Sequence, residues 1–485
     1  MLAMNVLLFN SPTVLPDFDF IARLPNLGIV SIAGNLDCDV HVADLHAARN
    51  WRRFVVRSMK KYSPDVVGIS AMSFQIGDAL EVATLAKERG AMVVMGGYHP
   101  TMLPDHVMSH EQVDMLVRGE GEATFSELIQ KLESGEGVKD IAGISYRSDG
   151  RVIHNPDRPI LDLCDIELPD RGARLIKRKF YVYTKNTDVV ETSRGCTYKC
   201  KFCSISKMYG RTFRKYSIER VIADIQSARD YGAKGIAFSD DNITLDTERL
   251  VDLCGAIVEA GLDDMHFYTQ ASSNGIARSP KISEAMAEAG FKSVFIGIEN
   301  VIERDLDFFS KNAKPSDSEQ AVRYLRDNDI IVSGGIVLGA PDDTREDLWT
   351  NFKLAKEMGV DVPIFYVSTP YPSTVLREEL LEEGLVENVD DYNKYDGLTA
   401  NVRTHSLTAR EIQYETWKMY ERYFDFNWAR STLIRKHYPG WILKSALKLY
   451  PKYFVRRIFN GLHIKGEEAF FEDDVRRRVY SKGGL

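Results

Sequence analysis

The 485-residue sequence predicts an α/β protein with two successive α/β units and a helical C-terminal region. Two observations carry this prediction. Apolar runs typical of buried strands alternate with amphipathic stretches from residue 4 to about 135, and six strand-then-helix units follow between residues 188 and about 395. Buried strands that alternate with helices form parallel sheets covered on both faces. Beyond about residue 400 the pattern is helical and irregular.

The first unit, residues 1–138, has the alternation of a flavodoxin-like (Rossmann) sheet. Its expected strands are Val6–Phe9, Val40–Ala43, Val66–Ile69, Met92–Met95 and Met115–Val117. Its expected helices are Leu27–Leu36, Trp51–Tyr62, Ala79–Arg89 and Thr124–Leu132. Because the strands are apolar throughout, we expect helices on both faces of this sheet.

Ligands of such sheets bind at the carboxyl ends of the strands. Glycine there lets a large ligand approach the backbone, and serine and glutamate offer hydrogen bonds to amide groups. Each single glycine is also explained as a turn residue. The candidate ligand residues in these loops are Ser11, Pro12, Ser70, Ser73, Gly96, Gly97, His99, Gly119, Glu120, Gly121 and Glu122.

A connector, residues 139–185, leads into the second unit, residues 186–398. Ile144–Tyr146 and Arg151–His154 flank Asp149-Gly150, which predicts a β-hairpin. The six units that follow predict an open, partial (β/α)6 barrel of the TIM-like kind, with its active site at the carboxyl ends of the strands. The expected strands are Val189–Thr192, Gly235–Ser239, His266–Thr269, Ser293–Ile298, Ile331–Val337 and Ile364–Ser368.

Polar residues fall at those strand ends. Asp240 and Asp241 follow the second strand, and Glu299 ends the fourth. Asp240 alone is equally well explained as the N-cap of the next helix. Glu299 follows an otherwise apolar strand, and a buried charge there requires a reason. Further candidates are Gln270 and Ser272 after the third strand and Gly339 after the fifth.

The most informative feature of the chain is the triplet Cys196, Cys200 and Cys203, spaced C-x3-C-x2-C. Thiolates are the ligands of iron–sulfur clusters, and three of them leave one iron of a 4Fe–4S cluster open to a small molecule. The alternatives are a zinc knuckle or three buried thiols. Zinc requires a fourth ligand nearby, and no Cys or His lies between Cys203 and Cys254.

With an aromatic residue, Phe202, before the last cysteine, this triplet resembles the cluster loop of the radical S-adenosylmethionine (radical SAM) enzymes. The resemblance implies a 4Fe–4S cluster on the three cysteines and S-adenosylmethionine on its open iron, with Phe202, Ser204, Gln270 and Ser272 nearby. It further implies that Asp240 or Asp241 holds the methionyl amino group, that Glu299 binds the ribose or adenine, and that Gly339 lets the nucleoside approach. The chain departs from many members in having Ser239-Asp240-Asp241 where they have Gly-Gly-Glu.

The first unit resembles the cobalamin-binding domain that precedes many radical SAM domains. Pro25–Gly28, Gly96–Thr101 and Arg118–Glu122 match that pattern in order, and the resemblance makes the strand-end residues of the first unit cobalamin contacts. Asp44-Leu45-His46 begins a cobalt-ligand motif, but Arg49 replaces its glycine. We therefore expect His46 to be an ordinary surface histidine, His99 a hydrogen-bonding loop residue, and cobalt without a protein histidine.

The resemblance covers roughly residues 4–395 and implies a cobalamin-dependent radical SAM enzyme. The expected activity is methylation of an unactivated carbon in a hydrophobic substrate, lipid or tetrapyrrole-like, through a 5′-deoxyadenosyl radical, with a flavodoxin- or ferredoxin-type electron donor. Two alternatives remain. One is an oxidative cyclase or rearrangement enzyme in which cobalamin donates no methyl group, and the other is a non-enzymatic cobalamin sensor.

Charge and hydropathy exclude other classes. The net charge of −8 gives no support for a nucleic-acid partner. There is no run of 18 apolar residues and no signal peptide, so a cytoplasmic protein is expected. In the C-terminal region, residues 399–485, nine Lys and Arg interleave with aromatic residues between Asp425 and Glu467 without an acid. This pattern fits either a solvated helical lid over the barrel or peripheral contact with an anionic membrane surface.

Overall fold

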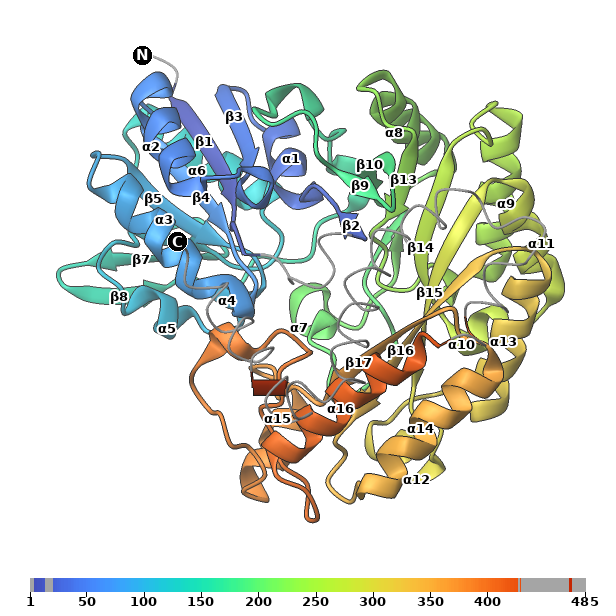
Figure 1. Ribbon diagram of the computed structural model, residues 1–485. Coiled ribbons are helices and arrows are strands. Elements are labelled where there is room, and N and C mark those ends of the chain that lie inside the picture. Colours follow the sequence, from blue (N-terminus) through green and yellow to red (C-terminus); the bar gives the residue numbers. More distant parts are fainter. Residues whose placement is uncertain (1–3, 14–20, 426–427, 429–470, 473–485) are drawn as a thin grey trace.

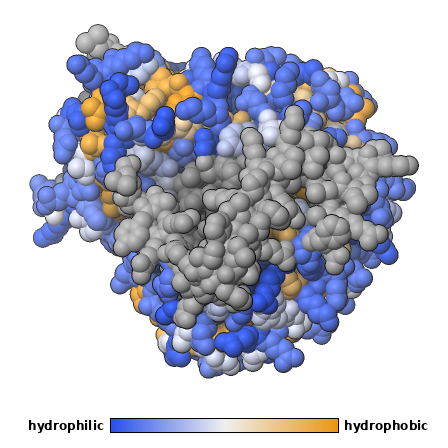
Figure 2. Space-filling view, viewed as in Figure 1, coloured by the Kyte–Doolittle hydropathy of each residue, from blue (hydrophilic) through white to orange (hydrophobic). Residues whose placement is uncertain are grey.

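The computed structural model describes residues 4–13, 21–425, 428 and 471–472. Two α/β units lie side by side, each built on its own sheet (Figure 1). Where described residues form the visible face, most of them are hydrophilic, with apolar residues in smaller groups (Figure 2). In the described part of the chain, no helix is both long and apolar enough to cross a membrane. The basic segment of the tail lies outside the described residues apart from Trp428.

The first sheet has the strand order β3-β1-β4-β5-β6-β7-β8. Its first five strands run parallel, and all five were predicted. They are β1 (Asn5–Asn10), β3 (Asp39–Asp44), β4 (Val66–Ser70), β5 (Met92–Gly96) and β6 (Met115–Val117).

Helices cover both faces of this sheet because β1 buries side chains on both sides. Leu7 and Phe9 join one apolar cluster, while Val6 and Leu8 join another. The first cluster packs under α2 (Trp51–Tyr62) and α3 (Ile76–Lys87), and the second under α1 (Leu27–Gly34) and α6 (Glu122–Ser134). The short helices α4 (Tyr98–Met102) and α5 (Pro104–Met108) follow β5.

The hairpin predicted in the connector is formed by β7 (Ile144–Ser148) and β8 (Arg151–His154). Asp149 and Gly150 have φ values of 49° and 74°, as a tight hairpin turn requires. Because β7 pairs antiparallel with β6, the hairpin extends the first sheet, which therefore runs past residue 138.

The second sheet is open, with the order β17-β16-β15-β14-β13-β10-β9-β2. The six predicted barrel strands are present and parallel: β10 (Lys185–Val190), β13 (Gly235–Phe238), β14 (His266–Ser272), β15 (Phe291–Glu299), β16 (Ile331–Leu338) and β17 (Val362–Val367). Two short antiparallel strands, β9 (Tyr181–Val182) and β2 (Ala22–Arg23), extend one edge. The N-terminal segment thus reaches across to the second sheet.

The remaining helices of the second unit pack around its sheet (Figure 1). Leu253, Met286, Leu325 and Leu348 join the second unit's apolar core, one from each of four long helices. The helices are α7 (Ile205–Tyr209), α8 (Ile218–Asp230), α9 (Thr247–Glu259), α10 (Ser273–Ile276), α11 (Pro280–Glu288), α12 (Glu303–Phe308), α13 (Pro315–Asp327), α14 (Arg345–Met358), α15 (Val375–Glu382) and α16 (Ala409–Tyr423). A two-stranded ribbon, β11 (Ser193–Arg194) and β12 (Arg214–Lys215), brackets the cysteine loop.

Candidate functional site

The three cysteines lie together on the loop between β11 and α7, at the carboxyl ends of the second sheet's strands. They line one cavity of ≈ 430 Å³ with residues from several neighbouring strand ends. The other lining residues include Tyr198, Lys199, Lys201, Phe202, Lys207, Arg211, Asp241, Asn242, Gln270, Ser272, Phe295, Gly297, Glu299 and Lys311. Sequence-distant side chains thus converge on the cysteine loop, as the barrel prediction requires.

Backbone contacts hold the cysteine loop in place. Gly195 has φ 89°, and a Cβ there would lie 2.4 Å from the Thr212 carbonyl oxygen, so only glycine fits. The Cys203 amide donates to the Cys200 carbonyl at 3.1 Å, which closes the turn. Phe202 packs edge-on against Phe309, with ring centroids 5.8 Å apart. The loop is therefore fixed at both ends of the triplet.

The chemistry of the donors fits a 4Fe–4S cluster. Burial raises the pKa of all three thiols, to about 11 for Cys200 and to about 12 for Cys203. The thiolates therefore require a cation to form at neutral pH. In the described part of the chain, no group of three or more Cys, His, Asp or Glu side chains is arranged to hold a single metal ion. A cluster spreads its ligands over several irons.

Only one of the two adjacent aspartates faces the cavity. Asp240 is fully buried and accepts hydrogen bonds from the Thr192 amide at 3.0 Å and from the hydroxyls of Thr192 and Ser193. It does not cap a helix, because Asp246 caps α9. Asp241 lines the cavity and accepts from the Gly195 amide at 2.8 Å. Burial raises its pKa to about 6, which leaves it largely charged at neutral pH.

Glu299 also lies in the cavity, paired with a lysine. Its Oε1 is 2.7 Å from the Lys311 Nζ, and both side chains are largely buried. Glu299 has φ 65°, an unfavourable value for a residue with a side chain, and such strain is concentrated at functional sites. A Cβ on Gly297 would lie 2.3 Å from Glu299 Oε1, so this glycine makes room for the carboxylate. No pattern in the sequence indicated Lys311 as a residue of the site.

Some of the other predicted site residues of the second unit line the cavity, and others do not. Gln270 and Ser272 line the cavity, and Gln270 also donates to the Asp240 carbonyl at 2.6 Å. Ser204 and Gly339 are not among the lining residues. Ser204 stands at the start of α7, and Gly339 has φ 88° and donates its amide to Asp343 at 2.7 Å.

At the first sheet, the strand-end residues form a tightly bonded edge. Ser11 is fully buried, and its amide donates to the Ser70 carbonyl at 3.3 Å. Gly97 has φ 95° and closely approaches the backbone of Ala71. Gly119 has φ 74°, and a Cβ there would meet no atom within 4 Å. The edge is therefore open at Gly119, which suits the approach of a large ligand. The remaining candidates, Pro12, Gly96 and Gly121, lie in the same strand-end loops.

Neither histidine of this edge is free to bind cobalt. His99 is fully buried, with Nδ1 at 3.1 Å from the Ser73 hydroxyl and Nε2 at 3.1 Å from His106 Nδ1. Burial lowers the pKa of His99 to about 3, so the ring is neutral. His46 is partly exposed beside Phe180, with Nδ1 3.5 Å from Asn10 Nδ2.

The carboxyl edge of the first sheet faces the cysteine loop. Helix α4, directly after β5, packs against α7, directly after the cysteines. Tyr98 of α4 lies close enough to Tyr209 of α7 for the two phenols to interact. Burial, Tyr209, Asp241 and Cys203 together raise the pKa of Tyr98. A ligand at this edge would therefore lie close to the cysteine loop.

Residues 190–372 match the radical SAM superfamily, and residues 21–129 match the B12 binding domain. An uncharacterized methyltransferase of Pyrococcus horikoshii, PH0819, is 34% identical over 87% of this chain and 93% of its own length. The hopanoid C-3 methylase of Methylococcus capsulatus is 25% identical over 85% and 79%. The anaerobic magnesium-protoporphyrin IX monomethyl ester cyclase of Cereibacter sphaeroides is 26% identical over 91% and 74%.

Two solved structures share the fold. The radical S-adenosylmethionine methyltransferase TsrM from Kitasatospora setae, with cobalamin and a [4Fe–4S] cluster bound, has TM-score 0.68 at 17% identity, covering 85% of this chain and 82% of its own. The cobalamin-dependent radical enzyme OxsB, with aqua-cobalamin and S-adenosylmethionine bound, has TM-score 0.72 at 16% identity, covering 99% and 75%.

The fold, the cysteine cavity and the sequence matches define a radical SAM enzyme. Within that superfamily, the chain carries a B12-binding domain in front of the barrel, and it belongs to the same family as the Pyrococcus protein. Its cofactors are a 4Fe–4S cluster, S-adenosylmethionine and cobalamin. The interpretation as a non-enzymatic sensor is therefore wrong.

A buried carboxyl group at the end of β3 makes stability depend on pH. Asp44 accepts from the Asn26 amide at 2.9 Å, and burial raises its pKa from 3.8 to about 7. The folded state therefore holds this proton more tightly than the unfolded state, so this group lowers stability as pH rises from about 4 to about 7. We expect the melting temperature of Asp44→Asn to increase relative to the wild type between about pH 5 and about pH 8. A difference that does not change with pH would contradict this expectation.

Proposed function

We propose that this enzyme transfers a methyl group to an unactivated carbon of a hydrophobic small molecule, lipid or tetrapyrrole-like. The observation that carries the proposal is the contact of α4 with α7, which brings the carboxyl edge of the B12-binding sheet next to the cysteine cavity. A substrate bound between this edge and the cysteine cavity would contact both cofactor sites. Several similar proteins are named methyltransferases or methylases.

When bound, the cluster and S-adenosylmethionine supply a carbon-centred radical, and cobalamin supplies a methyl group. Cys196, Cys200 and Cys203 would hold the cluster. Asp241, charged at neutral pH, would accept hydrogen bonds from the methionyl amino group. Glu299 would bind the ribose, because its carboxylate reaches into the cavity beside Gly297.

Lysine and apolar side chains complete this arrangement. Glu299 raises the pKa of Lys311, so its Nζ keeps the proton and holds the carboxylate in place. Ile205, Ala271, Phe295 and Val375 also line the cavity. Apolar walls exclude water from a radical and suit a hydrophobic substrate. The electron would come from a flavodoxin- or ferredoxin-type donor.

A second candidate function is supported by the cyclase of Cereibacter sphaeroides, which aligns over 91% of this chain. In an oxidative cyclisation or rearrangement, cobalamin would not donate a methyl group. The two functions therefore differ in what becomes of S-adenosylmethionine, since only methyl transfer converts it to S-adenosylhomocysteine.

The test is anaerobic turnover of the reconstituted enzyme with methyl-labelled S-adenosylmethionine and a panel of lipids and tetrapyrroles, followed by mass spectrometry. We expect 5′-deoxyadenosine, S-adenosylhomocysteine and one labelled product to form together. A product that forms with 5′-deoxyadenosine but without S-adenosylhomocysteine or label would refute methyl transfer and support the cyclase alternative.

A further inference from the structure

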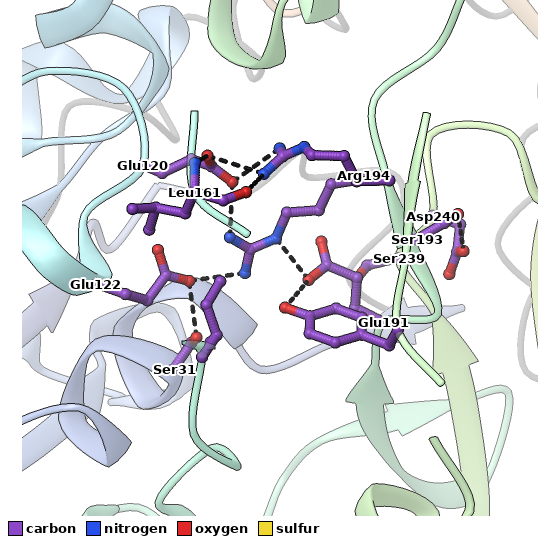
Figure 3. A network of polar contacts seen from close by, with 12 residues as sticks. Ser31, Glu120, Glu122, Leu161, Glu191, Ser193, Arg194, Ser239 and Asp240 are labelled. Carbon is purple, nitrogen blue, oxygen red and sulfur yellow. Dashed lines mark hydrogen bonds and ion pairs between the residues drawn. The ribbon is translucent and has the colours of Figure 1, made fainter. Parts of the chain in front are cut away.

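Arg194, two residues before the first cluster cysteine, is bound by three glutamates (Figure 3). Its Nε donates to Glu191 at 2.8 Å, its Nη1 to Glu120 at 2.9 Å and its Nη2 to Glu122 at 2.7 Å. All four side chains are at most 13% exposed. Each nitrogen of the guanidinium group thus has its own carboxylate, which fixes the orientation of the planar group.

These contacts join the two units of the protein. Glu120 lies in the loop between β6 and α6 of the B12-binding unit, and Glu122 is the first residue of α6, while Arg194 and Glu191 belong to the barrel unit. A second barrel arginine, Arg214 of β12, donates to both oxygens of Glu120, at 2.9 and 3.1 Å. The B12-binding unit thus contributes two buried acids, and the barrel unit contributes the two arginines that neutralise them.

The two acids were predicted to contact cobalamin, but the structure gives them other partners. Glu120 accepts four hydrogen bonds, from Arg194, twice from Arg214 and from the Leu161 amide. Four is about the capacity of a carboxylate. Glu122 accepts from Arg194 and, at 2.8 Å, from the Ser31 hydroxyl of α1. Most of the hydrogen bonds that Glu120 and Glu122 accept therefore come from Arg194 and Arg214, which flank the cysteine loop.

We propose that Arg194 is a positioning residue that couples the cysteine loop to the strand-end loop of the B12-binding unit through Glu120 and Glu122. A rigid three-way ion pair next to Cys196 would fix where the cluster lies relative to cobalamin. Displacements of about 1 Å between reacting groups reduce rates by as much as ~10²-fold. This inference rests on the proposed function only in naming methyl transfer as the step that needs the positioning, because the ion pairs are present whatever the reaction is.

The test compares the full-length wild type with Glu120→Gln/Glu122→Gln and with Arg194→Lys. The matched control is Glu127→Gln, which breaks an ion pair of α6 with Arg158, neither of which lines the cysteine cavity. Three quantities are measured: cobalamin affinity by absorbance titration, hydrogen–deuterium exchange of residues 195–203, and 5′-deoxyadenosine formed per S-adenosylhomocysteine.

We expect both coupling variants to bind cobalamin about as tightly as the wild type. Exchange in residues 195–203 should be faster by about tenfold or more, because charge-assisted hydrogen bonds hold the loop closed. 5′-Deoxyadenosine formed without methyl transfer should increase, because radical formation continues while the methyl donor is misplaced. The control should match the wild type in all three measurements. Arg194→Lys keeps the charge and loses the fork, so it tests the geometry even if the glutamine variant does not fold.

Two results would overturn the inference. If the glutamine variant bound cobalamin more than about tenfold more weakly than the wild type, the two acids would have to bind the cofactor. A tenfold loss corresponds to about one hydrogen bond to a charged group. Unchanged exchange in residues 195–203 would show that the ion pairs do not hold the loop. Neither measurement involves methyl transfer, so the coupling is tested even if the wild type forms no methylated product.

Discussion

Alanine in place of Cys196, Cys200 or Cys203 should abolish the iron–sulfur cluster and all formation of 5′-deoxyadenosine. Two thiolates remain in each variant, too few to hold a 4Fe–4S cluster. Iron per chain after anaerobic reconstitution should therefore fall from about four to near zero. The cysteines lie at the wall of a cavity and outside the apolar cores, so the variants should fold and still bind cobalamin.

Cys164→Ala is the matched control, because this thiol is exposed and lies outside the cavity. It should keep the wild-type iron content and activity. Near-normal iron in any one of the three triplet variants would contradict the assignment of that cysteine as a ligand. Loss of iron in Cys164→Ala would show that a fourth thiolate contributes.

Much of the fold followed from sequence because its strands are parallel and buried on both faces. Such strands read as short apolar runs, and the runs at Val6–Phe9 and Ser293–Ile298 mark β1 and β15 to within a few residues. Asp149-Gly150 likewise marks its hairpin, since few other residue pairs adopt two positive φ values. By contrast, β2 has only two residues, and its pairing with β9 is determined by long-range packing that leaves no local pattern.

The site likewise contains residues that could be predicted from the sequence and residues that could not. The cysteine triplet lies within eight residues, so its spacing alone predicted a shared cavity. Asp240 and Asp241 could not be separated, because adjacent residues after a strand face opposite ways and either could have faced the cavity. The partners of Glu299 and Glu120 could not be found either. Lys311 and Arg214 come from other elements and meet these acids only in the folded chain.

Arg171 is another residue with no signal in the sequence, and it anchors the connector to the barrel unit. Its side chain is fully buried and lies 2.5 Å from an oxygen of Asp224 and 3.2 Å from one of Asp188. It also donates to the Val189 carbonyl at 3.0 Å. Arg174, three residues on, pairs with both oxygens of Asp188. The connector thus brings two arginines to two buried aspartates at β10 and α8.

Replacing Arg171 with methionine should destabilise the protein strongly. Methionine fills similar volume but leaves Asp224 buried without its cation, and removing one partner of a buried ion pair destabilises by about 3–5 kcal/mol. The measurement is the free energy of unfolding in denaturant, compared with Arg229→Met. Arg229 pairs with Asp264 at the surface, where side-chain exposures are 34% and 66%, so that substitution should change stability by at most about 1 kcal/mol.

If Arg171→Met were no more destabilising than this control, Asp224 would have to be stabilised without Arg171, and the connector would not depend on this ion pair. A large loss for Arg171→Met alone would show that burial, which withholds water from the unpaired aspartate, makes this contact strong.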